Sequence, residues 1–172
     1  MRRTIAVGII AVIATSLGLG TMAGANSQSD TRSELARARQ ATHQYHDSAV
    51  AEADGFHATD ECVELPDGSG GMGFHYVNYA RIDRNLVIEK PEAVLYEPTG
   101  NGRKLVAIEY VVPDRNQNLS TDDDRPSLFG DAFDGPMPGH TPGMPIHYDQ
   151  HVWAWEANPN GTFAQWNPNV HC

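Results

Sequence analysis

This 172-residue sequence predicts an α+β fold, in which an N-terminal helix packs on an antiparallel sheet or a small β-barrel. Three observations carry the prediction. A stripe of mostly apolar residues at helical spacing comes first. Segments rich in aromatic and β-branched residues follow, separated by Gly, Pro and Asn. Two of these segments are joined by Thr-Gly-Asn-Gly at residues 99–102, a turn that favours an antiparallel hairpin.

The helix is predicted over residues 32–54. Residues 31–34 (Thr-Arg-Ser-Glu) have the capping-box pattern that starts a helix. Asp54 and Gly55 form a natural stop, because Gly tolerates the left-handed conformation at a helix end. Between them, residues at steps of three and four mark one buried face: Leu35, Ala38, Thr42, Tyr45, Ala49 and Ala53.

Four later segments read as strands, and a long connection precedes the last of them. The strands are expected at residues 72–78, 93–97, 104–112 and 146–155. The connection, residues 114–145, contains five prolines with many Asp and Gly residues. A connection of this length in a small domain is more often functional than accidental. We interpret its Pro- and Gly-rich second half, residues 135–145, as an ordered covering loop.

The first 25 residues have the order of a secretory signal peptide. Arg2 and Arg3 form a basic head, residues 4–18 are uncharged and mostly apolar, and small residues at 23–25 suit a signal peptidase. The apolar run is shorter than the ~20 residues of a membrane-spanning helix. We expect residues 1–25 to be removed and residues 26–172 to form a single globular domain, without a membrane span, in an extracytoplasmic location.

The two cysteines, Cys62 and Cys172, predict one disulfide. In an oxidising compartment an even pair of cysteines usually forms a bond. The bond would close a loop of about 110 residues and fix the C-terminus to the domain. The alternative, two thiolate metal ligands, lacks the usual short spacing between cysteines.

Composition excludes several classes of function. Cleavage after Ala25 would remove two arginines and no acid, so the net charge of −10 would become −12. A chain this acidic, without a basic patch, is not expected to bind nucleic acid. The sequence has no P-loop, dinucleotide fingerprint, HExxH or G-x-S-x-G motif, so no nucleotide cofactor is expected.

The histidines are the main candidates for a functional site. His147 and His151 lie four residues apart in the last predicted strand, so their side chains share a face, and His75 lies in the first strand. Two or three imidazoles with one carboxylate form a usual ligand set for zinc or copper. Glu109, inside an apolar strand, is the favoured carboxylate because an acid there is costly to bury unless it is paired, protonated or ligating. His140 would close the site from the covering loop.

The sequence also offers weaker candidate ligands, and it allows ordinary structural roles for the histidines and for Glu109. Glu97, at the end of the second predicted strand, is an alternative carboxylate, and His43 and His46 form a possible pair three residues apart. Any one histidine is more often a hydrogen-bonding residue than a ligand. Glu109 would face water if its strand had one solvated side.

Motifs along the chain resemble those of a known group of proteins. They are ATHQYHD at 41–47, GMGFHYVN at 71–78, LYEP at 95–98, GPMPGH at 135–140, MPIHY at 144–148, HVW at 151–153 and WNP at 166–168. Together they resemble a family of small exported bacterial and archaeal proteins whose function is not known. The resemblance spans nearly the whole mature chain and implies no activity, fold or ligand set.

Three hypotheses of function remain open. The favoured hypothesis is an exported domain that binds copper or zinc through the His-rich site, for storage, delivery or metal-assisted chemistry on a small ligand. The alternative is a metal-free extracellular binding or structural module that uses its Trp-rich C-terminal region and Pro-rich loop as a contact surface. A metal-free hydrolase with His and Glu in acid–base roles has the least support.

Overall fold

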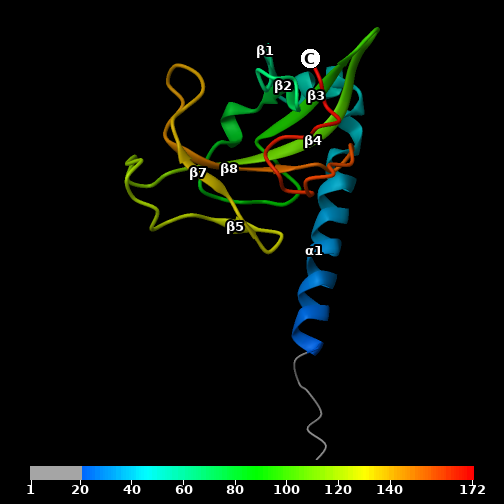
Figure 1. Ribbon diagram of the computed structural model, residues 1–172. Helices are drawn as coiled ribbons and strands as arrows, with labels where there is room; N and C mark the ends of the chain where they lie inside the picture. The colour runs from blue at the N-terminus through cyan, green and yellow to red at the C-terminus, as the bar shows by residue number, and fades with distance from the viewer. Residues whose placement is uncertain (1–20) are drawn as a thin grey trace, which may run out of the picture.

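The computed structural model describes residues 21–172, and its main element is a six-stranded antiparallel sheet (Figure 1). The strand order is β1-β2-β3-β4-β8-β7. The bounds are β1 His57–Glu64, β2 Gly71–Val77, β3 Ala93–Thr99, β4 Gly102–Pro113, β7 Asp134–Met137 and β8 His147–Val152. β1 and β7 are open edges, so the α+β class is confirmed and the sheet does not close into a barrel.

The smaller elements lie in the connections. A 3-10 turn, η2 (Tyr79–Arg81), follows β2. Within the long connection before β8, β5 (Ser127–Leu128) and β6 (Asp131–Ala132) form a two-stranded ribbon, and β7 joins the main sheet. The connection is therefore less irregular than its composition suggests.

The N-terminal helical region differs from the single helix predicted over residues 32–54. Three elements replace it: α1 (Thr21–Thr42), the 3-10 turn η1 (His43–His46) and α2 (Ser48–Ala53). The break falls at Asp47, whose backbone is extended and whose Oδ1 accepts a hydrogen bond from the Ala49 N–H at 3.0 Å. Asp is among the strongest helix N-caps, so it starts a new helix here instead of continuing the first.

Residues 1–20, which include most of the predicted signal peptide, lie outside the described residues. Residues 21–25 form the first part of α1. Within residues 21–172, no helix combines the length and the apolar character needed to cross a membrane.

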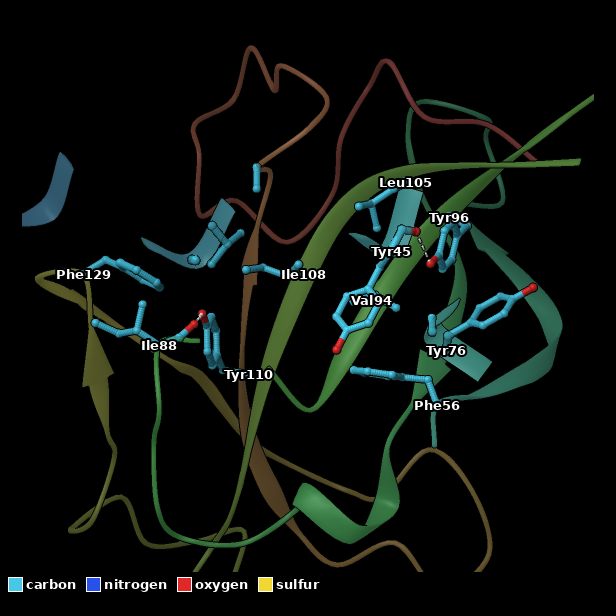
Figure 2. Packing of buried hydrophobic residues seen from close by; sticks show 14 of the residues in the cluster. Tyr45, Phe56, Tyr76, Ile88, Val94, Tyr96, Leu105, Ile108, Tyr110 and Phe129 are labelled. Carbon is cyan, nitrogen blue, oxygen red and sulfur yellow. Dashed lines mark hydrogen bonds between the residues drawn. The ribbon is translucent and has the colours of Figure 1, made fainter. Parts of the chain in front are cut away.

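One face of the sheet forms the main core against the helical region (Figure 2). Val94 and Tyr96 from β3 and Ile108 and Tyr110 from β4 are fully buried in this core. Two tyrosine hydroxyls donate hydrogen bonds to backbone carbonyls at 2.6 Å, Tyr96 to Tyr45 and Tyr110 to Ile88. Both of these buried hydroxyls therefore have a partner inside the core, which offsets the cost of removing them from water.

The opposite face of the sheet has a smaller apolar cluster. It is formed by Met72, Ala93, Leu95, Val106, Ala107, Trp153 and Val170. Since strand side chains alternate between faces, the residues next to Val94 and Ile108 along β3 and β4 point to this side. The candidate ligands lie on this second face.

The predicted disulfide between Cys62 and Cys172 is present and links β1 to the C-terminal residue. β1 itself was not predicted, because Asp and Glu in residues 57–64 are unfavourable in strands. The bond holds the last residues beside this edge strand. There, the imidazole Nδ1 of His171 lies 3.1 Å from the Glu64 carboxylate.

Candidate metal centre

Three strands bring His75, Glu109 and His151 together. Glu109 on β4 lies directly opposite His151 on β8 in the antiparallel register. On its other side Glu109 faces Ala93 on β3, which carries only a methyl group and is fully buried. His75 on β2 pairs with Leu95, two residues along β3 from Ala93, and its Nε2 lies 3.6 Å from Glu109 Oε2 on the other side of β3. One ligand atom from each of the three residues lies within 4.8 Å of the other two.

Burial favours the metal-binding form of the two imidazoles and disfavours that of the carboxylate. Burial lowers the pKa of His75 to about 4 and the pKa of His151 to about 3, so both imidazoles are uncharged at neutral pH. Burial also raises the pKa of Glu109 well above its ordinary value, and the carboxylate of Asp149 raises it further. A bound cation would stabilise the ionised form of Glu109, which is the form that coordinates.

Several buried polar atoms near this group have no hydrogen-bond partner within the described part of the chain. They are His151 Nδ1, His151 Nε2, His147 Nε2 and Asp149 Oδ1. A buried polar atom without a partner costs about 1–3 kcal/mol, and native proteins contain few of them. All four lie on the same face of β8, and we infer that this face presents donors to a ligand.

A cavity of about 690 Å³ lies over the three residues. Its floor includes His75, Glu109 and His151, and the Pro-rich segment contributes His140 and Met144 to the wall. The segment interpreted as a covering loop therefore lines the cavity above the site. A metal ion held by the three floor residues would face a space large enough for a small molecule.

His147 lies on the same face as His151 but outside the group of three. Its side chain is fully buried, and its ring centre lies 4.9 Å from that of His140. The two histidines of β8 are four residues apart, which in a strand separates their Cα atoms by about 13 Å. A shared face therefore does not mean a shared ion, and the structure does not bring His147 into this group.

Asp149 is the residue whose importance sequence reasoning missed. Its Oδ2 lies 3.9 Å from His147 Nε2, and its Oδ1 lies 4.0 Å from His151 Nδ1. Burial, together with the charge of Asp134, raises the pKa of Asp149 to about 7. The alternation of residues 147, 149 and 151 already placed it between the two histidines. Asp149 was not predicted as a metal ligand, because Glu109 was the favoured carboxylate.

The weaker candidates lie elsewhere. Glu97 pairs with Lys104 at 3.4 Å at the surface end of the β3–β4 hairpin. His43 and His46 pack against Trp155, with ring centres 5.8 and 4.4 Å from it. Of the three tryptophans, Trp153 is buried, whereas Trp155 and Trp166 are half-buried and Trp166 also lines the cavity.

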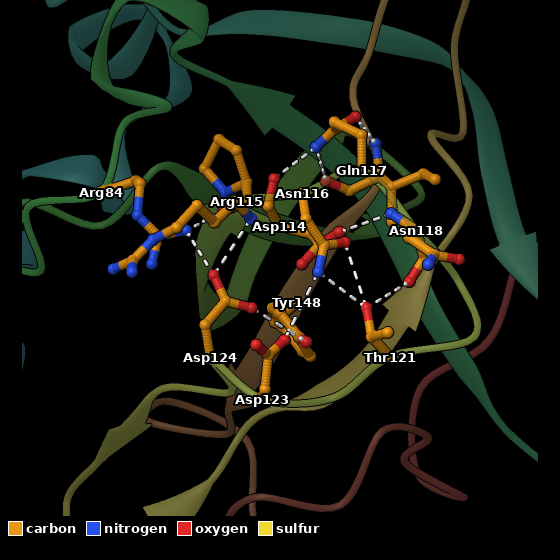
Figure 3. A network of polar contacts seen from close by, with 12 residues as sticks. Arg84, Asp114, Arg115, Asn116, Gln117, Asn118, Thr121, Asp123, Asp124 and Tyr148 are labelled. Carbon is orange, nitrogen blue, oxygen red and sulfur yellow. Dashed lines mark hydrogen bonds and ion pairs between the residues drawn. The ribbon is translucent and has the colours of Figure 1, made fainter.

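A polar loop before β5 fixes the start of β8 (Figure 3). The side chain of Gln117 accepts a hydrogen bond from the Ile146 N–H and donates one to the Ile146 carbonyl, both at 2.8 Å. Asp114 adds a third bond from its own N–H to the same carbonyl at 2.8 Å. Gln117 thus pairs with the backbone as a strand residue would, immediately before His147.

Comparison of the chain with protein-family models, with curated proteins and with solved structures finds no match. The functional argument therefore depends on the geometry of this site.

Proposed function

We propose that this protein is an exported metal-binding protein that holds a zinc or copper ion on His75, Glu109 and His151. The observation that carries the proposal is the convergence of the three donors from three strands within 4.8 Å of one another. His151 adds a specific argument, because both of its ring nitrogens are buried without a partner in the described chain. An ion on one nitrogen would remove the cost at that nitrogen.

The ligand chemistry supports a borderline transition metal. Two imidazoles and one carboxylate are the protein ligands of a common type of catalytic zinc site, and copper accepts the same nitrogen and oxygen donors. Thiolate ligands are excluded, because the two cysteines form a disulfide and no free cysteine is present.

The cavity favours metal-assisted chemistry on a small ligand over simple storage. Three protein ligands leave a fourth position of a tetrahedral ion open, whereas structural sites are usually closed by four. The cavity that this position would face is lined by the apolar side chains of Val77, Val111 and Met144, among others. An ion there would lower the pKa of a bound water and polarise an oxygen of the ligand.

The export part of the proposal rests on the leader sequence and on the disulfide. The basic head, apolar stretch and small residues of positions 1–25 have the order of a signal peptide. A disulfide between Cys62 and Cys172 fits an oxidising compartment outside the cytoplasm.

Elemental analysis of the purified protein tests the proposal. Protein prepared without chelators is expected to contain at least about one equivalent of zinc or copper per chain, and a His151→Ala variant far less. A His171→Ala variant is the matched control, because His171 is exposed and lies outside the cavity. Less than about a tenth of an equivalent of zinc, copper or iron, unchanged after reconstitution, would refute metal binding.

A further inference from the structure

β8 presents two separate sets of unpartnered donors to the cavity side of the sheet. His151 belongs to the group with His75 and Glu109. His147, about 13 Å away along the strand, is too distant to bind the same ion as His151 without distortion. It is nevertheless fully buried, and its Nε2 has no partner among the described residues. The group of three does not explain this donor.

The ring of His147 is oriented as metal-binding histidines usually are. Its Nδ1 lies 3.1 Å from the Pro145 carbonyl oxygen, so we assign the proton to Nδ1, which donates to that oxygen. The lone pair of Nε2 is then free to bind a metal ion. A histidine that gives one N–H to a backbone carbonyl and keeps the other nitrogen free is the usual second-shell arrangement at metal sites.

Asp149 and His140 supply the other two donors. Asp149 Oδ2 lies 3.9 Å from His147 Nε2, too far for a hydrogen bond but within the largest separation, about 4.4 Å, of two atoms bound to one ion. The ring centres of His140 and His147 are 4.9 Å apart, close to the separation of about 5 Å for two imidazoles on a tetrahedral ion.

We propose that His140, His147 and Asp149 form a second transition-metal site, beside the one formed by His75, Glu109 and His151. This inference rests on the proposed function, because it adds a second ion on the same face of the sheet, where His140 and Asp149 also line the cavity. Asp149 lies between the two sites, with one oxygen toward His147 and the other toward His151.

The second site closes only when its loop moves inward. Unlike His75, Glu109 and His151, its three donors do not all come within 4.8 Å of one another in the structure of residues 21–172. His140 is its exposed member and comes from the Pro-rich loop, whereas His147 and Asp149 are fixed on β8. Binding of the second ion therefore draws His140 toward the strand and the loop over the cavity.

The stoichiometry of zinc binding tests the second site. Metal-free protein is dialysed against buffered zinc, and bound zinc per chain is measured for the wild type, His140→Gln, Asp149→Asn, Glu109→Gln and the His171→Gln control. We expect two ions in the wild type and the control. One ion is expected in His140→Gln and Asp149→Asn, which lack only a ligand of the second site, and one in Glu109→Gln. Because His140 is exposed, its replacement leaves the core intact, and circular dichroism checks the fold of each variant.

The outcomes separate the two proposals. One ion in the wild type that is lost in Glu109→Gln would overturn the second site and leave the first. Two ions retained in both His140→Gln and Asp149→Asn would overturn the assignment of these ligands. No bound zinc in the wild type would overturn both proposals.

Discussion

Replacement of Glu109 by glutamine is expected to weaken zinc binding by more than about 100-fold and to stabilise the metal-free protein at neutral pH. Loss of a group that only supports a ligand already costs about 10–100-fold in affinity, and Glu109 is proposed as a ligand itself. The gain in stability has a separate cause. Glu109 is buried beside Asp149 in the metal-free protein, and glutamine removes the ionisable group from that position.

The stability difference has a defined pH dependence. The pKa of Glu109 is raised on folding from an unfolded value near 4.5, so the folded state binds the proton more tightly than the unfolded state. Its favourable contribution is fully present below pH 4.5 and is lost as the pH rises toward the folded pKa. The stability advantage of Glu109→Gln over the wild type should therefore be small near pH 4 and should increase toward pH 8.

Two measurements check this prediction. Competition with a chromophoric chelator gives the zinc affinity, and urea unfolding of the metal-free proteins between pH 4 and pH 8 gives the stability. Glu61→Gln is the matched control, because Glu61 lines the same cavity but is exposed and outside the group of three. Unchanged zinc affinity in Glu109→Gln would contradict its role as a ligand. A metal-free variant less stable than the wild type at pH 8 would contradict the claim that burial of ionised Glu109 destabilises the metal-free protein.

Removal of the disulfide is expected to lower the free energy of unfolding by about 4–5 kcal/mol. A bond that joins residues 110 apart restricts the unfolded chain strongly in the chain-entropy model. Typical domains have a total stability of about 5–15 kcal/mol, so this loss leaves little in reserve. The folded fraction should still bind zinc, because Cys62 lies on the edge strand β1 and the proposed first-site ligands lie on β2, β4 and β8.

Urea unfolding of the Cys62→Ser/Cys172→Ser double variant measures the loss. Both cysteines are replaced so that no free thiol remains. Wild-type protein kept reduced during unfolding is the matched comparison and should show the same decrease. A decrease below about 1 kcal/mol in both samples would mean that the denatured chain gains little freedom when the bond is cut.

The sequence predicted those turns and strands whose formation depends mainly on neighbouring residues. The turn at residues 99–102 lies between β3 and β4 as expected, and the strands around His75 and Glu109 have nearly the predicted bounds. The helix was predicted less well, because the apolar spacing continues through Asp47 while its side chain caps a new helix. Periodicity alone does not report such a competing hydrogen bond.

The site required information that no local pattern contains. His75, Glu109 and His151 were each identified as candidates, but their convergence depends on β8 pairing beside β4 in the register that puts Glu109 opposite His151. It also depends on the pairing of β2 and β4 on either side of β3, which brings His75 within 3.6 Å of Glu109. Register and strand order are set by the whole sheet. The local sequence therefore could not predict which residue lies opposite which across neighbouring strands.

The shared face of His147 and His151 was predicted correctly, but proximity did not follow from it. Residues four apart lie on neighbouring turns of a helix, about 6 Å apart, and about 13 Å apart in a strand. Because β8 is a strand, the two histidines lie at opposite ends of it with Asp149 between them. This spacing is the reason for proposing two sites instead of one five-ligand centre.

Anomalous X-ray diffraction from crystals of the zinc-loaded protein, recorded on both sides of the zinc absorption edge, tests the central claim most directly. We predict an anomalous peak on the cavity floor, bonded to His75, Glu109 and His151 at about 2.0–2.2 Å. No peak among these three residues, or zinc bound only by the pair His43 and His46 near Trp155, would contradict it.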